Sequence, residues 1–342
     1  MAHNAHLSQP DPELAALLAH IPHAPPPSDI TVRRNAFNTF ALPKIQAVFK
    51  TNAPDASKYR VEDHKVPVEG AEILVRAIIP TPNPSDANES QTYPLMVWMH
   101  PGGYVLGSIE MEDYLLRRIS VEFQLTIVNV EYRLAPEFPY PTGMNDSYAA
   151  LKWAASHTAL LSASLDKGFI ISGCSAGGNF AASLSIRARD DPFFVNRPLT
   201  GQLLQLPQVL HPEAAPERFK DELYSREQNK DAPLLTWAEV VEFTKIYKAP
   251  LDDPQYSVLL ASDHRDLPPA YIQVCGLDTL RDEGLLYEKI LRDAGVQTKL
   301  DVYPGLPHGG HILLPSASIS VKVNKDFEKG LRWLLHRQES SA

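Results

Sequence analysis

A serine stands among small residues in the sequence Gly173-Cys174-Ser175-Ala176-Gly177. The apolar run Phe169–Ser172 before it predicts a strand, and the stretch Gly178–Asp190 after it predicts a helix. A sharp strand-to-helix turn exposes the serine hydroxyl and places it near a helix N-terminus, where negative charge is favoured. The pattern therefore predicts a nucleophilic serine at position 175. The alternative is a glycine-rich helix start with an idle serine.

A second glycine-rich turn, His100-Pro101-Gly102-Gly103-Tyr104, follows the apolar run Leu95–Met99. Glycines leave backbone N–H groups unobstructed, which is what a developing oxyanion requires. The alternative is an ordinary Pro-Gly turn. His100 belongs to this donor loop, so we expect it to hold the loop rather than to act as a base.

A nucleophilic serine needs a base, and the base needs an orienting carboxylate. Asp278 follows the predicted strand Tyr271–Cys275, where its side chain can face the site. Asp282 and Glu283 fall in the first turn of the next predicted helix, and we expect them to compensate the helix dipole.

The candidate base is a histidine in the turn-rich sequence Pro304–His311, which follows the predicted strand Lys299–Tyr303. His308 lies among glycines and prolines, as a mobile loop base would, and is preferred over His311. The order serine, acid, histidine, with each residue after a predicted strand, is the chain order expected with a nucleophile turn of this kind.

Short apolar runs alternate with helical patterns, which predicts an α/β fold with a mostly parallel sheet. An antiparallel pair, Tyr59–Val66 and Ala71–Ile79, comes before them, and Pro80–Pro94 is expected to be a loop. The predicted buried strands are Leu95–Met99, Thr126–Val130, Phe169–Ser172, Tyr271–Cys275 and Lys299–Tyr303. The predicted helices that flank them are Met111–Gln124, Asn145–His157, Gly178–Asp190, Arg281–Ala294 and Val321–His336.

Residues 205–264 are too long for the one strand–helix unit expected there, and long insertions in compact domains are usually lids or binding loops. Together with residues 1–50, they predict a helical cap, interrupted near its start by Pro25–Pro27. The catalytic domain then comprises residues 51–204 and 265–342. The aromatic residues expected in the cap are Phe37, Phe40, Trp237, Phe243 and Tyr247.

The composition excludes several classes of protein. The chain has 342 residues with 32 Lys and Arg against 41 Asp and Glu, and this formal charge of −9 argues against a nucleic-acid binder. No apolar window is long enough for a transmembrane helix, and no secretory signal is recognisable, so we expect a cytoplasmic protein. No metal or cofactor motif is present. Cys174 and Cys275 are expected to be buried and unpaired.

The segments His100–Tyr104, Glu131–Pro141 (EYRLAPEFPYP), Gly173–Gly178 and Asp278–Glu283, with His308-Gly309, are found in this order. In them the chain resembles the hormone-sensitive-lipase-like carboxylesterases of the α/β-hydrolase superfamily, over roughly residues 60–337. The resemblance implies Ser175 as nucleophile, His308 as base and acid, and Asp278 as its orienter. It implies oxyanion donors at Gly102, Gly103 and Ala176. Pro101 departs from the group, which usually has a third glycine there, and this removes one backbone donor.

The resemblance further implies a serine carboxylic-ester hydrolase that acts on a short-acyl or small-molecule ester without cofactor or metal, with a role in secondary metabolism. Homodimer formation stays open. The same site would also suit a lactonase, an acyltransferase, a deacetylase or a dehydratase. A non-catalytic small-molecule receptor on this scaffold is the alternative from another class.

Overall fold

The computed structural model describes residues 4–20, 27, 29–82, 91–214 and 216–336. The expected break at Pro25 and Pro26 and residues 83–90 of the expected loop lie outside these residues. No helix in the described part of the chain has the length and apolar character needed to cross a membrane.

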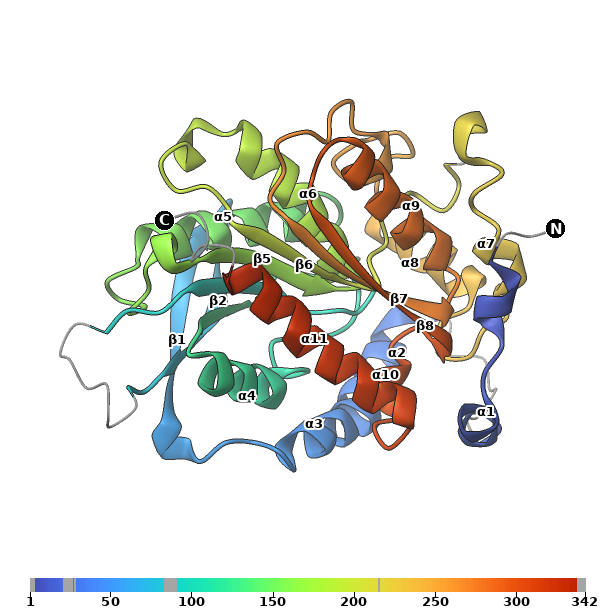
Figure 1. Ribbon diagram of the computed structural model, residues 1–342, viewed down its shortest axis with the longest axis horizontal. Coiled ribbons are helices and arrows are strands. Elements are labelled where there is room, and N and C mark those ends of the chain that lie inside the picture. The colour runs from blue at the N-terminus through green and yellow to red at the C-terminus, as the bar shows by residue number, and fades with distance from the viewer. Residues whose placement is uncertain (1–3, 21–26, 28, 83–90, 215, 337–342) are drawn as a thin grey trace.

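One eight-stranded sheet forms the centre of the molecule, in the order β1-β2-β4-β3-β5-β6-β7-β8 (Figure 1). β1 and β2 pair antiparallel, β2 runs antiparallel to β4, and the remaining pairs are parallel. The strands are β1 Tyr59–Val68, β2 Ala71–Pro80, β3 Leu95–Met99, β4 Thr126–Val130, β5 Phe169–Cys174, β6 Gly201–Gln205, β7 Ala270–Leu277 and β8 Thr298–Pro307. The predicted α/β class and the antiparallel pair are confirmed.

Helices cover both faces of this sheet, as a parallel sheet requires. The apolar sides of α5, α6 and α9 pack in one core cluster, and those of α1, α4 and α11 pack in the cluster on the other face. The helices are α1 Pro12–Leu18, α2 Ile30–Ala36, α3 Leu42–Lys50, α4 Asp113–Phe123, α5 Thr142–Ser156, α6 Ala176–Asp190, α7 Ser225–Gln228, α8 Trp237–Tyr247, α9 Arg281–Asp293, α10 Gly310–Leu313 and α11 Ser318–His336. A π-helical turn, Phe37–Ala41, joins α2 to α3.

The strand β6 was not predicted, because two glutamines interrupt its apolar residues. Both are buried, and the amide nitrogen of each donates a hydrogen bond inside the protein. Gln205 donates to the side chain of Gln273 on β7 at 2.7 Å, and Gln202 donates to the carbonyl of Pro268 at 3.0 Å. A strand whose polar groups are paired in this way does not show the unbroken apolar pattern of its neighbours.

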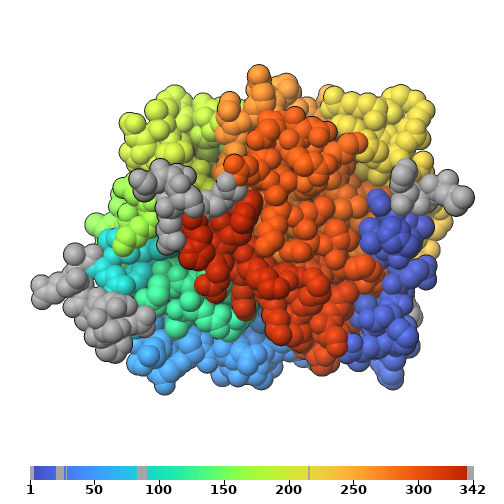
Figure 2. Space-filling model, in the orientation of Figure 1, coloured from blue at the N-terminus to red at the C-terminus, as the bar shows by residue number. Residues whose placement is uncertain are grey.

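Residues 5–8 contact the strands β7 and β8. In Figure 2 the N-terminal segment, in dark blue, lies against the orange and red surface of the C-terminal part of the chain. A Cβ atom on Gly276 would lie 2.1 Å from the carbonyl oxygen of Leu7, and one on Gly305 would lie 2.3 Å from Cα of Pro10. The backbones therefore approach too closely for any side chain at these two positions. The segment thus touches the ends of both β7 and β8, the strands that lead to Asp278 and His308.

Candidate active site

The turn between β5 and α6 places Ser175 in a strained conformation, with φ of 55° and ψ of −114°. A Cβ on Gly173 would lie 2.3 Å from the carbonyl oxygen of Gly177, and one on Gly177 would lie 2.1 Å from that of Met99. Only glycine therefore fits two residues before the serine and two residues after it. Positive φ at a non-glycine residue is uncommon, and strain of this kind concentrates at functional sites.

Asp278 and His308 are neighbours because of the sheet register. Leu277 on β7 pairs in parallel with Pro307 on β8, so the residues that follow them leave the sheet side by side. The Nδ1 atom of His308 lies 2.7 Å from one carboxylate oxygen of Asp278. The other oxygen accepts the N–H of Leu280 at 2.9 Å, which fixes the plane of the carboxylate.

The same imidazole reaches the serine with its other nitrogen. The Nε2 atom of His308 lies 2.9 Å from Oγ of Ser175. The structure therefore brings together the three residues singled out in the sequence as nucleophile, base and orienter. Such a chain lets the imidazole take the hydroxyl proton while the carboxylate holds it in the required tautomer.

The glycine-rich loop after β3 also has left-handed backbone, with φ of 132° at Gly102 and 59° at Gly103. The carbonyl of Gly102 accepts the N–H groups of Val105 and Leu106, which folds the loop back on itself. Among the described residues, no protein acceptor takes the N–H groups of Gly102, Gly103 or Ala176. Gly102 and Gly103 line the same cavity as Ser175, and Ala176 follows Ser175 directly in the chain.

His100 holds this loop, as expected. Its ring stacks on Tyr132 with centroids 4.1 Å apart, and its Nδ1 atom lies 2.7 Å from the carbonyl oxygen of Pro101. Burial lowers the pKa of His100 to about 4, so the ring is neutral near pH 7. Burial has the same effect on the rival His311, whose pKa is lowered to about 4, and no hydrogen bond within the described residues links it to Ser175.

Ser175 and His308 open into a cavity of about 480 Å³ whose walls are mostly apolar. One wall comes from α2, the π-helical turn and α3, and another from residues 208–243. The lining residues from these two segments are Arg33, Ala36, Phe37, Phe40, Ala41, Ile45, Gln208, Leu234, Leu235, Glu239, Val240 and Phe243. Of the aromatic residues expected in the cap, Trp237 and Tyr247 do not line the cavity.

Two arginines of α2 attach this helix to its neighbours. Arg33 forms an ion pair with Glu239 of α8, and its guanidinium lies 4.5 Å from the centroid of the Phe243 ring. Arg34 points the other way and donates to the carbonyls of Val105 at 2.9 Å and Ala135 at 2.7 Å. The first contact fixes α2 to α8, and the second fixes it to the glycine-rich loop.

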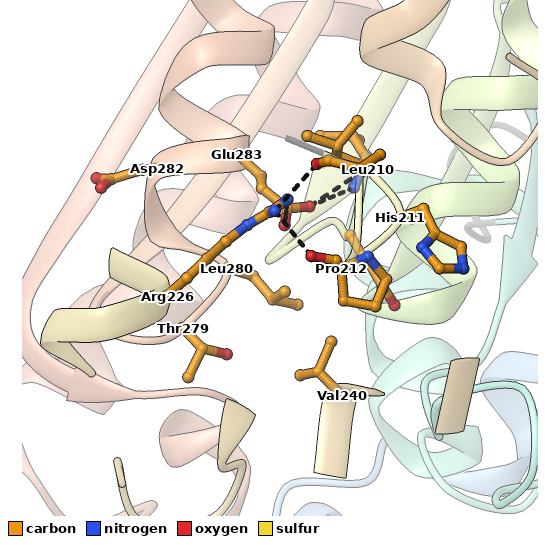
Figure 3. Close-up of polar contacts among 12 residues, drawn as sticks. Leu210, His211, Pro212, Arg226, Val240, Thr279, Leu280, Asp282 and Glu283 are labelled. Carbon is orange, nitrogen blue, oxygen red and sulfur yellow. Dashed lines mark hydrogen bonds and ion pairs between the residues drawn. The ribbon is translucent and has the colours of Figure 1, made fainter. Parts of the chain in front are cut away.

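The two acids at the start of α9 make contacts that the sequence pattern did not predict. Glu283 accepts the N–H groups of Val209 and Leu210 at 3.0 and 3.1 Å and pairs with Arg226 at 2.9 Å (Figure 3). Burial raises the pKa of this carboxyl above its usual value. The expectation of simple dipole compensation was incomplete, because both side chains are buried against residues that lie far away in sequence. Two adjacent acids directly after Arg281 were the only trace of these contacts in the sequence.

Comparison with known proteins identifies the family of this chain. The model of a family described as alpha/beta hydrolase fold matches residues 96–312. An AB hydrolase superfamily protein of Schizosaccharomyces pombe is 36% identical over 84% of this chain and 83% of its own. A versiconal hemiacetal acetate esterase of Dothistroma septosporum is 33% identical over 72% of this chain and 75% of its own.

Solved structures extend the likeness over nearly the whole chain. The crystal structure of vibralactone cyclase matches with a TM-score of 0.93 and 42% identity, covering 97% of both chains. A bacterial heroin esterase matches with a TM-score of 0.81 and 28% identity, covering 95% of this chain and 98% of its own. The expected carboxylesterase likeness is confirmed, and the chain is an esterase-type hydrolase. It belongs to the α/β-hydrolase fold family, in the group that resembles hormone-sensitive lipase.

Proposed function

We propose that the protein is a serine carboxylic-ester hydrolase in which Ser175, His308 and Asp278 form the catalytic triad. The observation that supports this most directly is the hydrogen-bonded chain of 2.9 and 2.7 Å that links the three side chains. In acylation, His308 takes the proton of Ser175 Oγ as that oxygen attacks the ester carbonyl. The oxyanion then accepts the N–H groups of Gly102, Gly103 and Ala176.

To complete acylation, His308 then acts as an acid. His308 gives its proton to the departing alkoxide, and the C–O bond to the alcohol breaks to leave the acyl group on Ser175. A water molecule, deprotonated by His308, attacks the acyl carbonyl, and the acid leaves as Ser175 regains its proton. Asp278 stays ionised throughout and stabilises the imidazolium formed in each step.

We further propose that residues 1–50 and 205–264 form a cap over a catalytic domain of residues 51–204 and 265–342. The apolar walls that both segments contribute favour an uncharged substrate, since burying an unpaired charge is costly. Relatives named for versiconal hemiacetal acetate and for heroin support a small-molecule ester, and the first supports a role in secondary metabolism.

A fluorophosphonate probe tests the nucleophile. We expect the wild-type protein to label and Ser175→Ala to fail, and labelling of the variant would contradict the assignment. A series of p-nitrophenyl esters from acetate to palmitate tests the cap. We expect rates to fall sharply for the long chains, and equal rates along the series would contradict a restrictive cavity.

A second candidate is transfer of the acyl group to a hydroxyl of the same substrate, which forms a lactone. It is favoured by the match to vibralactone cyclase and by the apolar walls, which would limit access of water to the acyl-enzyme. Incubation with esters of hydroxy acids separates the two reactions. Lactone as the main product would favour transfer, whereas free acid alone would favour hydrolysis.

A further inference from the structure

The loop that carries Asp278 leaves the sheet irregularly. The pairing of β7 with β8 shifts register between Cys275 and Leu277, immediately before Asp278. Carbonyl groups at such a point lose their regular partners in the sheet, and buried carbonyls need others. Those of Gly276, Asp278 and Thr279 all find partners outside the sheet.

Asn229, which follows α7, provides two of these partners. Its Nδ2 atom donates to the carbonyl of Asp278 at 2.8 Å and to that of Gly276 at 3.2 Å. The side chain is buried, and its amide oxygen has no partner among the described residues. Both hydrogen bonds that the Asn229 amide makes within the described residues therefore go to the loop that carries Asp278.

Ser225, at the start of the same helix, holds the next part of the loop. Its Oγ donates to the carbonyl of Thr279 at 2.9 Å, and its N–H donates to Asp282 at 2.7 Å. Arg281 is fully buried and donates to Gln228 of α7 at 2.7 Å while it pairs with Asp282. Residues 225–229 and 276–282 are thus joined along their length.

Helix α7 is itself fixed to the body of the protein. Arg226 reaches Glu283 on α9 and donates to the carbonyl of Pro212 at 3.0 Å (Figure 3). This pair is buried on the Glu283 side, and separating α7 from α9 would leave the Glu283 carboxylate buried without its partner, which is costly. The Asn229 amide at the end of α7 can therefore hold the Asp278 loop in a fixed position.

We propose that Asn229 is a positioning residue that fixes Asp278 against His308 by holding the backbone of the Asp278 loop. The inference rests on the proposed function, because it requires Asp278 to orient His308. It adds that residues 225–229, which lie in the segment assigned to the cap, set the geometry of the triad as well as covering the cavity. A displacement of about 1 Å from such a loss can lower turnover by about 10²-fold.

The test compares kcat and KM of Asn229→Ala and Asn229→Asp with the wild-type protein, using p-nitrophenyl butyrate. The aspartate has nearly the same shape but turns a carboxylate toward two carbonyl oxygens. We expect kcat to fall by about 10-fold to 10²-fold with KM within about twofold, because the loss affects orientation rather than binding. If Asn229→Asp does not fold, Asn229→Ala decides alone.

Asn129→Ala is the matched control, since Asn129 is also buried and its amide also holds a backbone carbonyl, that of Ile109 at 2.8 Å. It should lose thermal stability to a similar extent and keep kcat. A kcat for the Asn229 variants as high as that of the control would overturn the inference.

A double-mutant cycle separates this role from a merely structural one. In an Asp278→Asn background, Asn229→Ala should lower kcat by less than about twofold. The carboxylate that Asn229 is proposed to position is already absent there. The same fold loss in both backgrounds would contradict the inference and leave the triad intact. Full activity of Asp278→Asn itself would overturn both the triad and the positioning role.

Discussion

At the scale of single residues, the site depends on positions where only one side chain is compatible with the backbone. Gly103 has φ of 59°, and a Cβ atom there would lie 2.4 Å from Cδ2 of Phe243. The ring that forms a wall of the cavity thus rests directly on a proposed oxyanion donor. Glycine is therefore required at position 103 for two reasons, the positive φ and the close contact with Phe243.

Gly103→Ala should lower kcat by about 10²-fold, the usual loss when one oxyanion donor is removed. The methyl group would push either Phe243 or the loop away from its position. Steady-state kinetics with a p-nitrophenyl ester measure the effect. Gly295→Ala is the control, since φ there is 84° but nothing lies within 4 Å of the new Cβ. Gly295→Ala should be less stable than the wild-type protein and equally active. Equal kcat values for the two variants would contradict the proposed role of Gly103 as an oxyanion donor.

Glu112 provides a prediction about pH. Burial raises the pKa of this carboxyl to about 8, and its only hydrogen bond within the described residues comes from the indole of Trp98 at 3.2 Å. The folded state therefore holds a proton that the unfolded state has released above pH 4.5. The contribution of Glu112 to stability is then largest below pH 4.5 and declines as pH rises to about 8.

Glu112→Gln keeps a hydrogen-bond acceptor for Trp98 and cannot ionise. Its melting temperature relative to the wild-type protein should therefore rise between pH 5 and pH 8.5. Thermal denaturation at the two pH values is the measurement. A constant difference would show that the carboxyl is not protonated in the folded protein.

At the scale of helices and strands, the sequence pattern located most elements, and its failures share a cause. β3, β4 and β5 are buried along their length and consist mostly of apolar residues, so they could be predicted. β6 and the contacts of residues 225–229 could not, because they depend on polar groups that find partners far away in sequence. Examples are the hydrogen bond from Gln205 to the side chain of Gln273 and the one from Asn229 to the carbonyl of Asp278. Periodicity carries no information about such pairs.

The link between α2 and the glycine-rich loop yields a prediction at this scale. Arg34→Met leaves the carbonyls of Val105 and Ala135 without these donors, and Arg34→Lys keeps the charge but cannot donate to both in the same way. Both variants should lower kcat/KM by about 10-fold, as expected when buried hydrogen bonds of a charged group are lost. Kinetics and thermal denaturation check this. Arg60→Met, which removes an exposed ion pair, should behave as the wild-type protein does.

At the scale of the whole molecule, the candidate site combines residues from strands that are separated in sequence and adjacent in the sheet. The motifs identified Ser175, Asp278 and His308, but only the register of β7 with β8 accounts for the contact between the last two. The cavity arises from α2, α3 and α8 together, so its volume and apolar character could not be read from any one segment.

Both cysteines are buried, although Cys174 borders the cavity at Ser175. Cys174 and Cys275 are buried and unpaired, as predicted, and burial raises the pKa of both thiols well above the usual value. Ellman's reagent should therefore react with neither thiol in the native protein and with two in guanidinium chloride. A thiol that reacts rapidly without denaturant would contradict the packing described for β5 and β7.

The contacts of Leu7 with Gly276 and of Pro10 with Gly305 have a consequence for the order of events in time. On a ribosome, residues near position 10 emerge long before the strand that carries Gly305 has been made. The loops of Asp278 and His308 cannot acquire this support until the two regions of the chain meet, and contacts between distant positions form slowly. Esterase activity would then appear only after nearly the whole chain has folded. The time at which activity appears would therefore report a late step in folding.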